Sequence, residues 1–202
     1  LLGALAVWAS YDLAQGGLQL AEQYPLVPQY GISLHLAVDG WGVALLLLTG
    51  VIITTGVLAT WTLEHREREF LVLLLVLVAG VYGVFVSQDL FVFFLFYEIA
   101  VLPMYLLIGI WGSEGEVERK GPFGFVWDKL NVGGREYSAM KLTLMLLAGS
   151  AAILVAMFGM YYAAGGSSFD FSVLQGADYP EGTQLWAFVL LWFGFGSLGG
   201  VF

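Results

Sequence analysis

One acidic side chain lies in the middle of a long apolar stretch, where a carboxyl group can take up and release a proton. Glu98 is the only charged residue between Leu90 and Ser113. A helix over 90–111 places this carboxyl group roughly 12 Å from the start of the stretch, at about 1.5 Å of rise per residue. Burial favours the neutral form of a carboxyl group, and a nearby cation favours its charged form. We therefore expect Glu98 to exchange protons near neutral pH.

Pro103 lies in the same apolar stretch, five residues after Glu98. Because proline has no backbone N–H, the carbonyl group of Ile99 loses its usual helical hydrogen bond. A free acceptor beside an acid favours ordered water and a kink in the helix. The alternative is a structural role, in which a permanently protonated Glu98 donates a hydrogen bond to a neighbouring helix.

Lys141 is the second charged residue close to apolar sequence, near the start of the stretch 138–163. Helical rise offsets it from Glu98 by roughly 10 Å in depth, which favours a relay through water or a third residue over a direct salt bridge. The alternative is that its long side chain reaches back to the membrane surface.

The remaining polar candidates have simpler interpretations. Asp39 and Asp89 directly precede long apolar stretches and are expected to cap the N-termini of helices. His35 and His65 lie in separate connecting segments without a second ligand at metal spacing, so both are interpreted as ordinary polar loop residues. The absence of cysteine gives no support to thiol chemistry.

The elements that position these residues follow from composition. The 202-residue chain is 59% hydrophobic and only 11% charged, with a mean hydropathy of +0.85, whereas soluble domains carry about a quarter charged residues. A bilayer core needs about 20 apolar residues per helix. We predict an all-α polytopic bundle with spans at about 1–13 (cut short), 41–62, 70–88, 90–111, 138–163 and 184–202. Apolar sequence at both ends leads us to expect a fragment of a longer protein.

The basic residues predict the orientation of these helices. All seven Lys and Arg residues fall in or beside two alternate connections, 63–69 and 112–137, whereas the connections on the other side carry only acids. By the positive-inside rule, the two basic loops face the cytoplasm and the segment 14–40 is an outer loop. A charged Glu98 within such a membrane would cost at least about 2.5–3.5 kcal/mol, so we expect a functional reason for it.

The sequence also contains a specific motif. The run from Phe96 to Gly112 reads Phe-Tyr-Glu-Ile-Ala-Val-Leu-Pro-Met-Tyr-Leu-Leu-Ile-Gly-Ile-Trp-Gly. It resembles the fifth helix of chain M of the proton-pumping NADH:quinone oxidoreductase, respiratory complex I. Two further stretches agree with this family: Val38-Asp39-Gly40 before a span, and Ala139-Met140-Lys141 followed by Gly149-Ser150, which resembles the sixth helix.

The resemblance implies an antiporter-like bundle of two inverted five-helix repeats, of which this chain covers the second helix into the seventh. It also implies that Glu98 is the functional glutamate of the fifth helix, which works with a lysine of the seventh helix. One departure matters: the expected Lys-x-Pro appears here as Leu198-Gly199-Gly200. We therefore expect Glu98 to lack its usual cation, with Lys141 as the candidate substitute.

The function expected from these observations is proton translocation by a membrane-arm subunit of complex I, with electron transfer from NADH to quinone in other subunits. Its partners would be those subunits and the lipid bilayer, and no nucleic acid. Without cysteines or a dinucleotide fingerprint, we expect no cofactor in this chain. The expected location is a bacterial inner membrane, with mitochondrial and thylakoid membranes as alternatives.

Two other functions remain open at this stage. One is a subunit of an Mrp-type sodium–proton antiporter or of a membrane-bound hydrogenase, built on the same fold. The other is a structural membrane scaffold that pumps nothing, an alternative that the substitution at Leu198 keeps open. The transported ion is accordingly either H⁺ or Na⁺.

Overall fold

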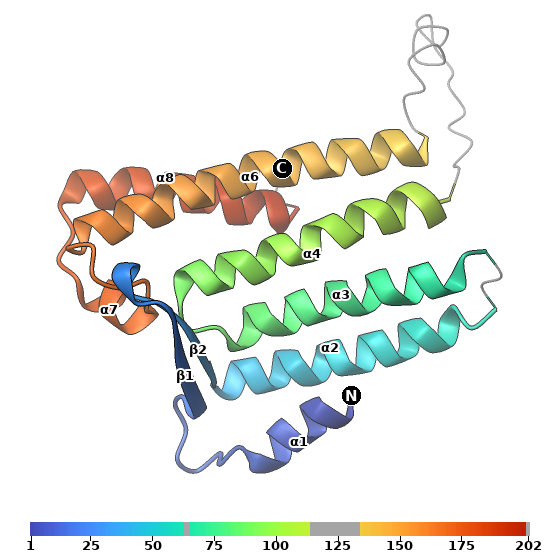
Figure 1. Cartoon of the computed structure of the whole chain (residues 1–202), viewed down its shortest axis with the longest axis horizontal. Helices are drawn as coiled ribbons and strands as arrows, with labels where there is room; N and C mark the ends of the chain where they lie inside the picture. Colours follow the sequence, from blue (N-terminus) through green and yellow to red (C-terminus); the bar gives the residue numbers. More distant parts are fainter. Residues whose placement is uncertain (63–64, 114–133, 201–202) are drawn as a thin grey trace, which may run out of the picture.

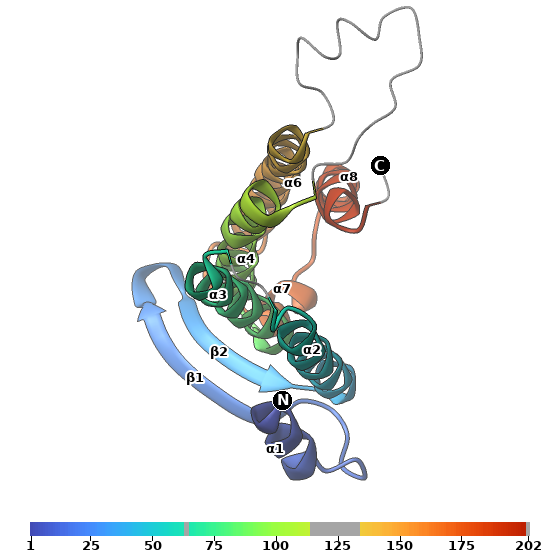
Figure 2. The ribbon, with the colours of Figure 1, turned by 90° about the vertical axis from the view of Figure 1, so that its right-hand side faces the viewer.

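The computed structural model describes residues 1–62, 65–113 and 134–200 of the chain. Long helices lie side by side in a row, and the last of them packs against one side of that row (Figures 1 and 2). The row contains α2 (Gly40–Ala59), α3 (Glu67–Val86), α4 (Leu90–Trp111) and α6 (Arg135–Ala163), and α8 (Glu181–Leu198) lies beside α6. The expected antiporter-like helical bundle is therefore present.

Four helices in the described ranges, α2, α3, α4 and α6, are long and apolar enough to cross a membrane. Helix α6 begins at Arg135, three residues before the predicted start of its span. Helix α1 (Leu2–Ser10) has only nine residues and packs against α2, and α8 has 18 residues. Membrane crossing by the segments 1–13 and 184–202 therefore stays a prediction. Most of the predicted cytoplasmic loop 112–137, and part of 63–69, lie outside the described residues.

The N-termini of α2 and α4 are capped by aspartates, as predicted. The Asp39 carboxylate accepts a hydrogen bond from the Gly42 amide at 2.6 Å. The Asp89 carboxylate accepts from the amides of Phe91 and Val92 at 3.0 and 3.1 Å. Each cap satisfies amide groups that have no partner within the helix.

The predicted all-α class is confirmed, but the segment 14–40 is not an irregular loop. It folds into an antiparallel hairpin of β1 (Gln19–Val27) and β2 (Ile32–Val38), joined by a short 3-10 helix, η1 (Pro28–Tyr30). Proline in this segment favoured a loop prediction, but proline is tolerated in an edge strand, and Pro25 lies in the exposed strand β1. Gly31 has a φ of +64°, which closes the turn without a side chain.

The hairpin crosses the ends of α2, α3 and α4, and β2 contacts all three helices (Figure 2). Strand β2 is mostly buried or half-buried, whereas β1 is exposed along almost its whole length. A second short element on the same side is α7 (Phe171–Gly176), in the connection between α6 and α8. This end of the bundle is the predicted outer face.

Small residues let the neighbouring helices approach closely. A Cβ atom on Gly83 of α3 would lie 2.2 Å from the Phe96 ring of α4. A Cβ atom on Gly149 of α6 would lie 2.0 Å from the Ser197 hydroxyl of α8. Close backbone approach through glycine is typical of helix packing in membranes. The first contact packs α4 against α3, and the second packs α8 against α6. Helix α4 also packs against α6 and therefore lies between α3 and α6.

Candidate functional site

Glu98 is half-buried near the middle of α4. Its Oε1 atom is buried and has no hydrogen-bond partner among the described residues. Leaving a buried polar atom unpaired costs about 1–3 kcal/mol, so such atoms in native proteins have a functional reason or bind water or a further chain segment. The structure therefore leaves the Glu98 carboxyl group available to a proton, to water or to a cation.

The face of α4 that carries Glu98 is different from the faces that pack against α3 and α6. Phe96 and Ala100 contact glycines of α3, and at about 3.6 residues per turn Glu98 lies on the opposite side of the helix. Along the same face, Leu102, one turn further, is 64% exposed, and Tyr105, two turns further, is 38% exposed. A partner for Glu98 can approach along this uncovered stripe.

Pro103 is buried inside α4, and the helix continues through it to Trp111. The proline nitrogen cannot donate to the carbonyl group of Ile99. That carbonyl group belongs to the residue next to Glu98, so the position of Pro103 keeps the expectation of a free acceptor beside the acid.

The structure does not bring Lys141 and Glu98 together. Lys141 is exposed on α6, and it forms no ion pair with Glu98. Helices α4 and α6 run antiparallel, with the Gly109 Cβ position 3.7 Å from the Cβ atom of Ala139. Counting from that contact, Lys141 and Glu98 differ by roughly 13 Å along the helices. Leu198, where the resemblance leads us to expect a lysine, is the last residue of α8.

A pocket lies between α4 and α6 on the predicted cytoplasmic side of Glu98. Its volume is about 340 Å³, and it is lined by Tyr105, Leu106, Gly109, Ile110, Glu136, Ala139 and Met140. Tyr105 belongs to both this pocket and the stripe that carries Glu98. The pocket also contains a carboxyl group, Glu136, which the sequence analysis did not select. Glu98 does not line this pocket: Tyr105, its nearest lining residue in sequence, is seven residues away, or roughly 10 Å along α4.

A second polar arrangement, absent from the sequence predictions, lies at the outer end of α4. Asp89 is fully buried, and besides capping α4 it accepts a hydrogen bond from the Ser33 amide of β2 at 3.1 Å. Burial raises the pKa of Asp89, the three amide donors oppose this shift, and the nearby Asp170 charge adds to it. The carboxyl group thus holds the hairpin to α4.

His35 of β2 reaches across to the other connection on this side. Its Nδ1 atom lies 2.5 Å from Oδ2 of Asp170, a residue 135 positions away in sequence. Asp170 also accepts from the Ser172 amide and hydroxyl group and so caps α7. Burial opposes ionisation of Asp170, but the hydrogen bonds from Ser172 and His35 outweigh it and lower the pKa of this carboxyl group.

The prediction that His35 is an ordinary polar loop residue is therefore wrong. Asp170 followed by Ser172 is a local signal for a helix cap, so the cap was detectable from sequence. The pairing of His35 with Asp170 has no local signal. In the described part of the chain, no group of three or more His, Asp or Glu side chains is arranged to hold a metal ion.

Comparison with known proteins places this helical arrangement in a family. Residues 87–198 match the family described as NADH:quinone oxidoreductase/Mrp antiporter, transmembrane. The chain is 35% identical over 189 residues to NAD(P)H-quinone oxidoreductase chain 4-2 of Synechocystis sp., covering 94% of this chain and 30% of the relative. It is 40% identical over 186 residues to NAD(P)H-quinone oxidoreductase chain 4 1 of Synechococcus sp., covering 92% and 32%. The chain thus spans about a third of the length of these relatives.

Solved structures share the fold. A chain of respiratory complex I from Thermus thermophilus with bound NADH superposes with a TM-score of 0.79 at 26% identity, covering 96% of this chain and 36% of that one. A chain of the Mrp complex from Dietzia sp. gives a TM-score of 0.68 at 18% identity, covering 96% and 19%, which shows the fold alone. The resemblance seen in the Phe96–Gly112 motif is confirmed at family level. This chain belongs to the NADH:quinone oxidoreductase/Mrp antiporter transmembrane family.

Proposed function

We propose that this chain is part of a proton-translocating membrane-arm subunit of a complex I, and that Glu98 takes up and releases the translocated proton. The observation that carries the proposal is the buried, unpartnered Oε1 atom of Glu98 in the middle of an apolar helix. The relatives named NAD(P)H-quinone oxidoreductase chain 4 and the Thermus complex I chain support the assignment to such a complex.

The proposed path begins at the pocket between α4 and α6, where Glu136 and Tyr105 meet the predicted cytoplasmic side. A proton that reaches Glu98 neutralises it, and the neutral form is the cheaper one in a membrane. Water held at the free carbonyl group of Ile99 would deliver the proton. A cation that approaches the uncovered stripe of α4 would favour the charged form and expel the proton. Lys141 is the proposed relay residue, acting through water because of its offset from Glu98.

Electron transfer belongs to other subunits in this proposal, and this chain binds no cofactor of its own. Neighbouring membrane subunits and lipid would cover the apolar faces of α2 and α8, where Leu58 and Leu185 are exposed. The proposed location is a bacterial inner membrane. The cyanobacterial relatives make a thylakoid membrane the alternative.

The test is a Glu98→Gln substitution in the complete complex, reconstituted into sealed vesicles. Glutamine keeps the size and polarity of the side chain but cannot release a proton. We expect quinone reduction to continue at a lower rate and the number of protons moved per electron pair to fall. The matched control is Glu181→Gln, a change at an acid that is exposed in the first turn of α8.

An unchanged proton-to-electron ratio in the Glu98 variant would remove this residue from the path. If the wild-type complex moved no protons through this subunit, a structural scaffold would be the better description. Sodium transport is the second candidate, because the family includes Mrp antiporters. Replacing Na⁺ by choline leaves the ratio unchanged for a proton pathway and abolishes transport for a sodium pathway.

A further inference from the structure

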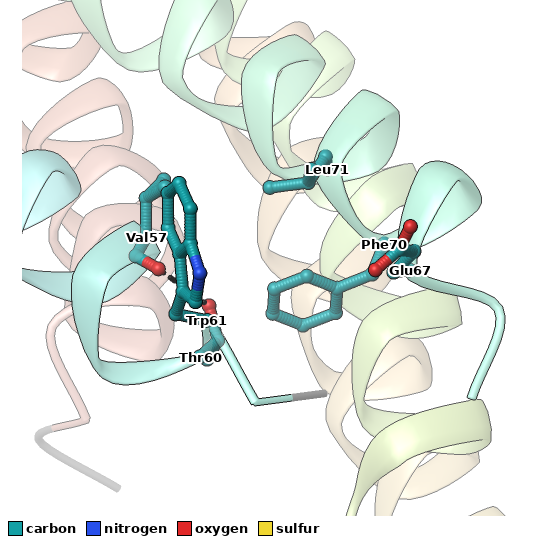
Figure 3. Close-up of a pocket in the computed structure, with 6 residues that line it drawn as sticks. All are labelled: Val57, Thr60, Trp61, Glu67, Phe70 and Leu71. Carbon is teal, nitrogen blue, oxygen red and sulfur yellow. Dashed lines mark hydrogen bonds between the residues drawn. The ribbon is translucent and has the colours of Figure 1, made fainter. Parts of the chain in front are cut away.

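A groove of about 260 Å³ lies where α2 ends and α3 begins, on the side of the basic loops. Figure 3 shows the indole ring of Trp61 on one wall and the ring of Phe70 facing it from α3. The groove is lined by Val57, Thr60, Trp61, Glu67, Phe70 and Leu71. None of these residues takes part in the proposed proton path.

The residues that line the groove change from apolar to polar along the membrane normal. Val57 lies within α2 and Leu71 within α3, so the apolar end of the groove points toward the bilayer core. Thr60 and Glu67 lie at the helix ends, where the predicted span meets water. Trp61 is 77% exposed, and an exposed tryptophan at this level suits the headgroup region.

The side chain of Arg66, next to Glu67 in the sequence, already interacts with other residues. Arg66 forms an ion pair with Glu69 and lies over the ring of Trp111, with its guanidinium carbon 6.0 Å from the ring centroid. The indole N–H of Trp111 donates to the carbonyl group of His65 at 2.8 Å, which fixes that ring. Glu67, in contrast, has no ion-pair partner among the described residues. Its negative charge is therefore available in a groove walled by two aromatic rings.

We propose that this groove binds the headgroup of phosphatidylethanolamine in the leaflet on the basic side. The Glu67 carboxylate attracts an ammonium group by charge, and the exposed ring of Trp61 attracts it by cation–π interaction. A primary ammonium donates hydrogen bonds to Glu67, which a quaternary ammonium cannot do, so the site selects phosphatidylethanolamine over phosphatidylcholine. Val57 and Leu71 contact the upper acyl chains.

The proposal does not depend on proton transport, and its test reads out lipid contact only. The complete complex is placed in vesicles that contain phosphatidylethanolamine with a photoreactive group near the start of one acyl chain. Phosphatidylcholine with the same acyl chain serves as the comparison lipid. After illumination, mass spectrometry measures labelling of the peptides that contain residues 57–71. Because only the primary ammonium donates hydrogen bonds to Glu67, we expect phosphatidylethanolamine to label them about threefold more than phosphatidylcholine.

Three variants sharpen the test. Glu67→Gln should abolish the preference, because the amide has no charge for the ammonium group. Glu67→Lys should turn the preference toward anionic phosphatidylglycerol. Trp41→Leu is the matched control, since Trp41 is 80% exposed at the opposite end of α2, and it should leave the preference unchanged. Equal labelling by the two lipids in the wild type would overturn the proposal. So would crosslinking of these peptides to another subunit in place of lipid.

Discussion

Asp89 and Glu98 lie on one helix and show two ways to hold a carboxyl group in an apolar chain. Asp89 accepts hydrogen bonds from three backbone amides and is fully buried. Glu98 keeps a buried oxygen without a partner in the described residues. The first arrangement suits a permanent structural role. The second suits a group whose protonation state changes.

The sequence predicted the importance of Glu98, but only part of the contacts that Asp89 makes. The lone acid in an apolar run identified Glu98, because a mid-membrane charge is costly wherever it occurs. Asp89 was predicted as a helix cap from its position before Leu90, and that cap is present. Its third hydrogen bond, from Ser33, joins residues 56 positions apart and has no local signal.

At the residue scale, Asp89→Ala should destabilise the protein more than Asp39→Ala. The Asp89 change removes a cap and leaves a buried Ser33 amide unpaired, which together cost about 2–4 kcal/mol. The Asp39 change removes only the cap that accepts from Gly42, at a cost of about 1 kcal/mol. Thermal unfolding of the complete protein in detergent micelles measures the difference. Equal losses of stability would contradict the structural role given to Asp89.

At the scale of elements, the outer side is held together by contacts between segments far apart in the chain. Besides the His35–Asp170 pair, the Leu90 amide donates to the Phe169 carbonyl group at 2.8 Å. The ring of Phe169 stacks on that of Tyr161, with centroids 4.1 Å apart. The hairpin, the start of α4 and the connection after α6 therefore form one connected outer layer.

This layer should loosen in acid. The folded-state pKa of Asp170 lies below its usual value, so the ionised group contributes stability above about pH 3.9. That contribution is lost as the pH falls through the lower folded-state value. Asp89 has a raised pKa and acts in the opposite sense, because its protonation in the folded state adds stability as the pH falls. Amide exchange in β2, corrected for the intrinsic effect of pH, should show protection down to about pH 4 and its loss below that.

A His35→Gln variant provides the control for this pH dependence. Without the histidine, the pKa of Asp170 moves back toward its usual value, so the loss of protection should be smaller and should be complete at a higher pH. Exchange near His65, the other histidine, should be the same in both proteins. Identical pH profiles for β2 in the wild type and the variant would show that the pair does not hold the hairpin.

At the scale of the whole molecule, the lengths of the uncharged runs and the positions of the charged residues predicted the long helices. They did not predict the structure of the connections between these helices. Uncharged runs near 20 residues predict helices because a bilayer demands that length. The hairpin was missed because Pro25 and Pro28 favour a loop, and only the contact of β2 with three helices explains why a strand forms there. The Glu98–Lys141 offset was predicted from helical rise, whereas the pocket with Glu136 depends on how α4 and α6 pack.

The same scale explains why Glu98 faces an uncovered stripe. The chain spans about a third of its relatives, and α4 is covered by α3 on one side and α6 on another. The stripe of Leu102 and Tyr105 remains open in the described part of the chain. A cation that approaches this stripe would favour the charged form of Glu98.

Infrared difference spectroscopy on the complete complex during turnover tests most directly whether Glu98 changes its protonation state. A protonated carboxyl group has a carbonyl stretching band that shifts in D₂O. We predict that such a band appears and disappears with turnover in the wild type and in Glu181→Gln, and is absent in Glu98→Gln. The same band in all three proteins would contradict the role given to Glu98.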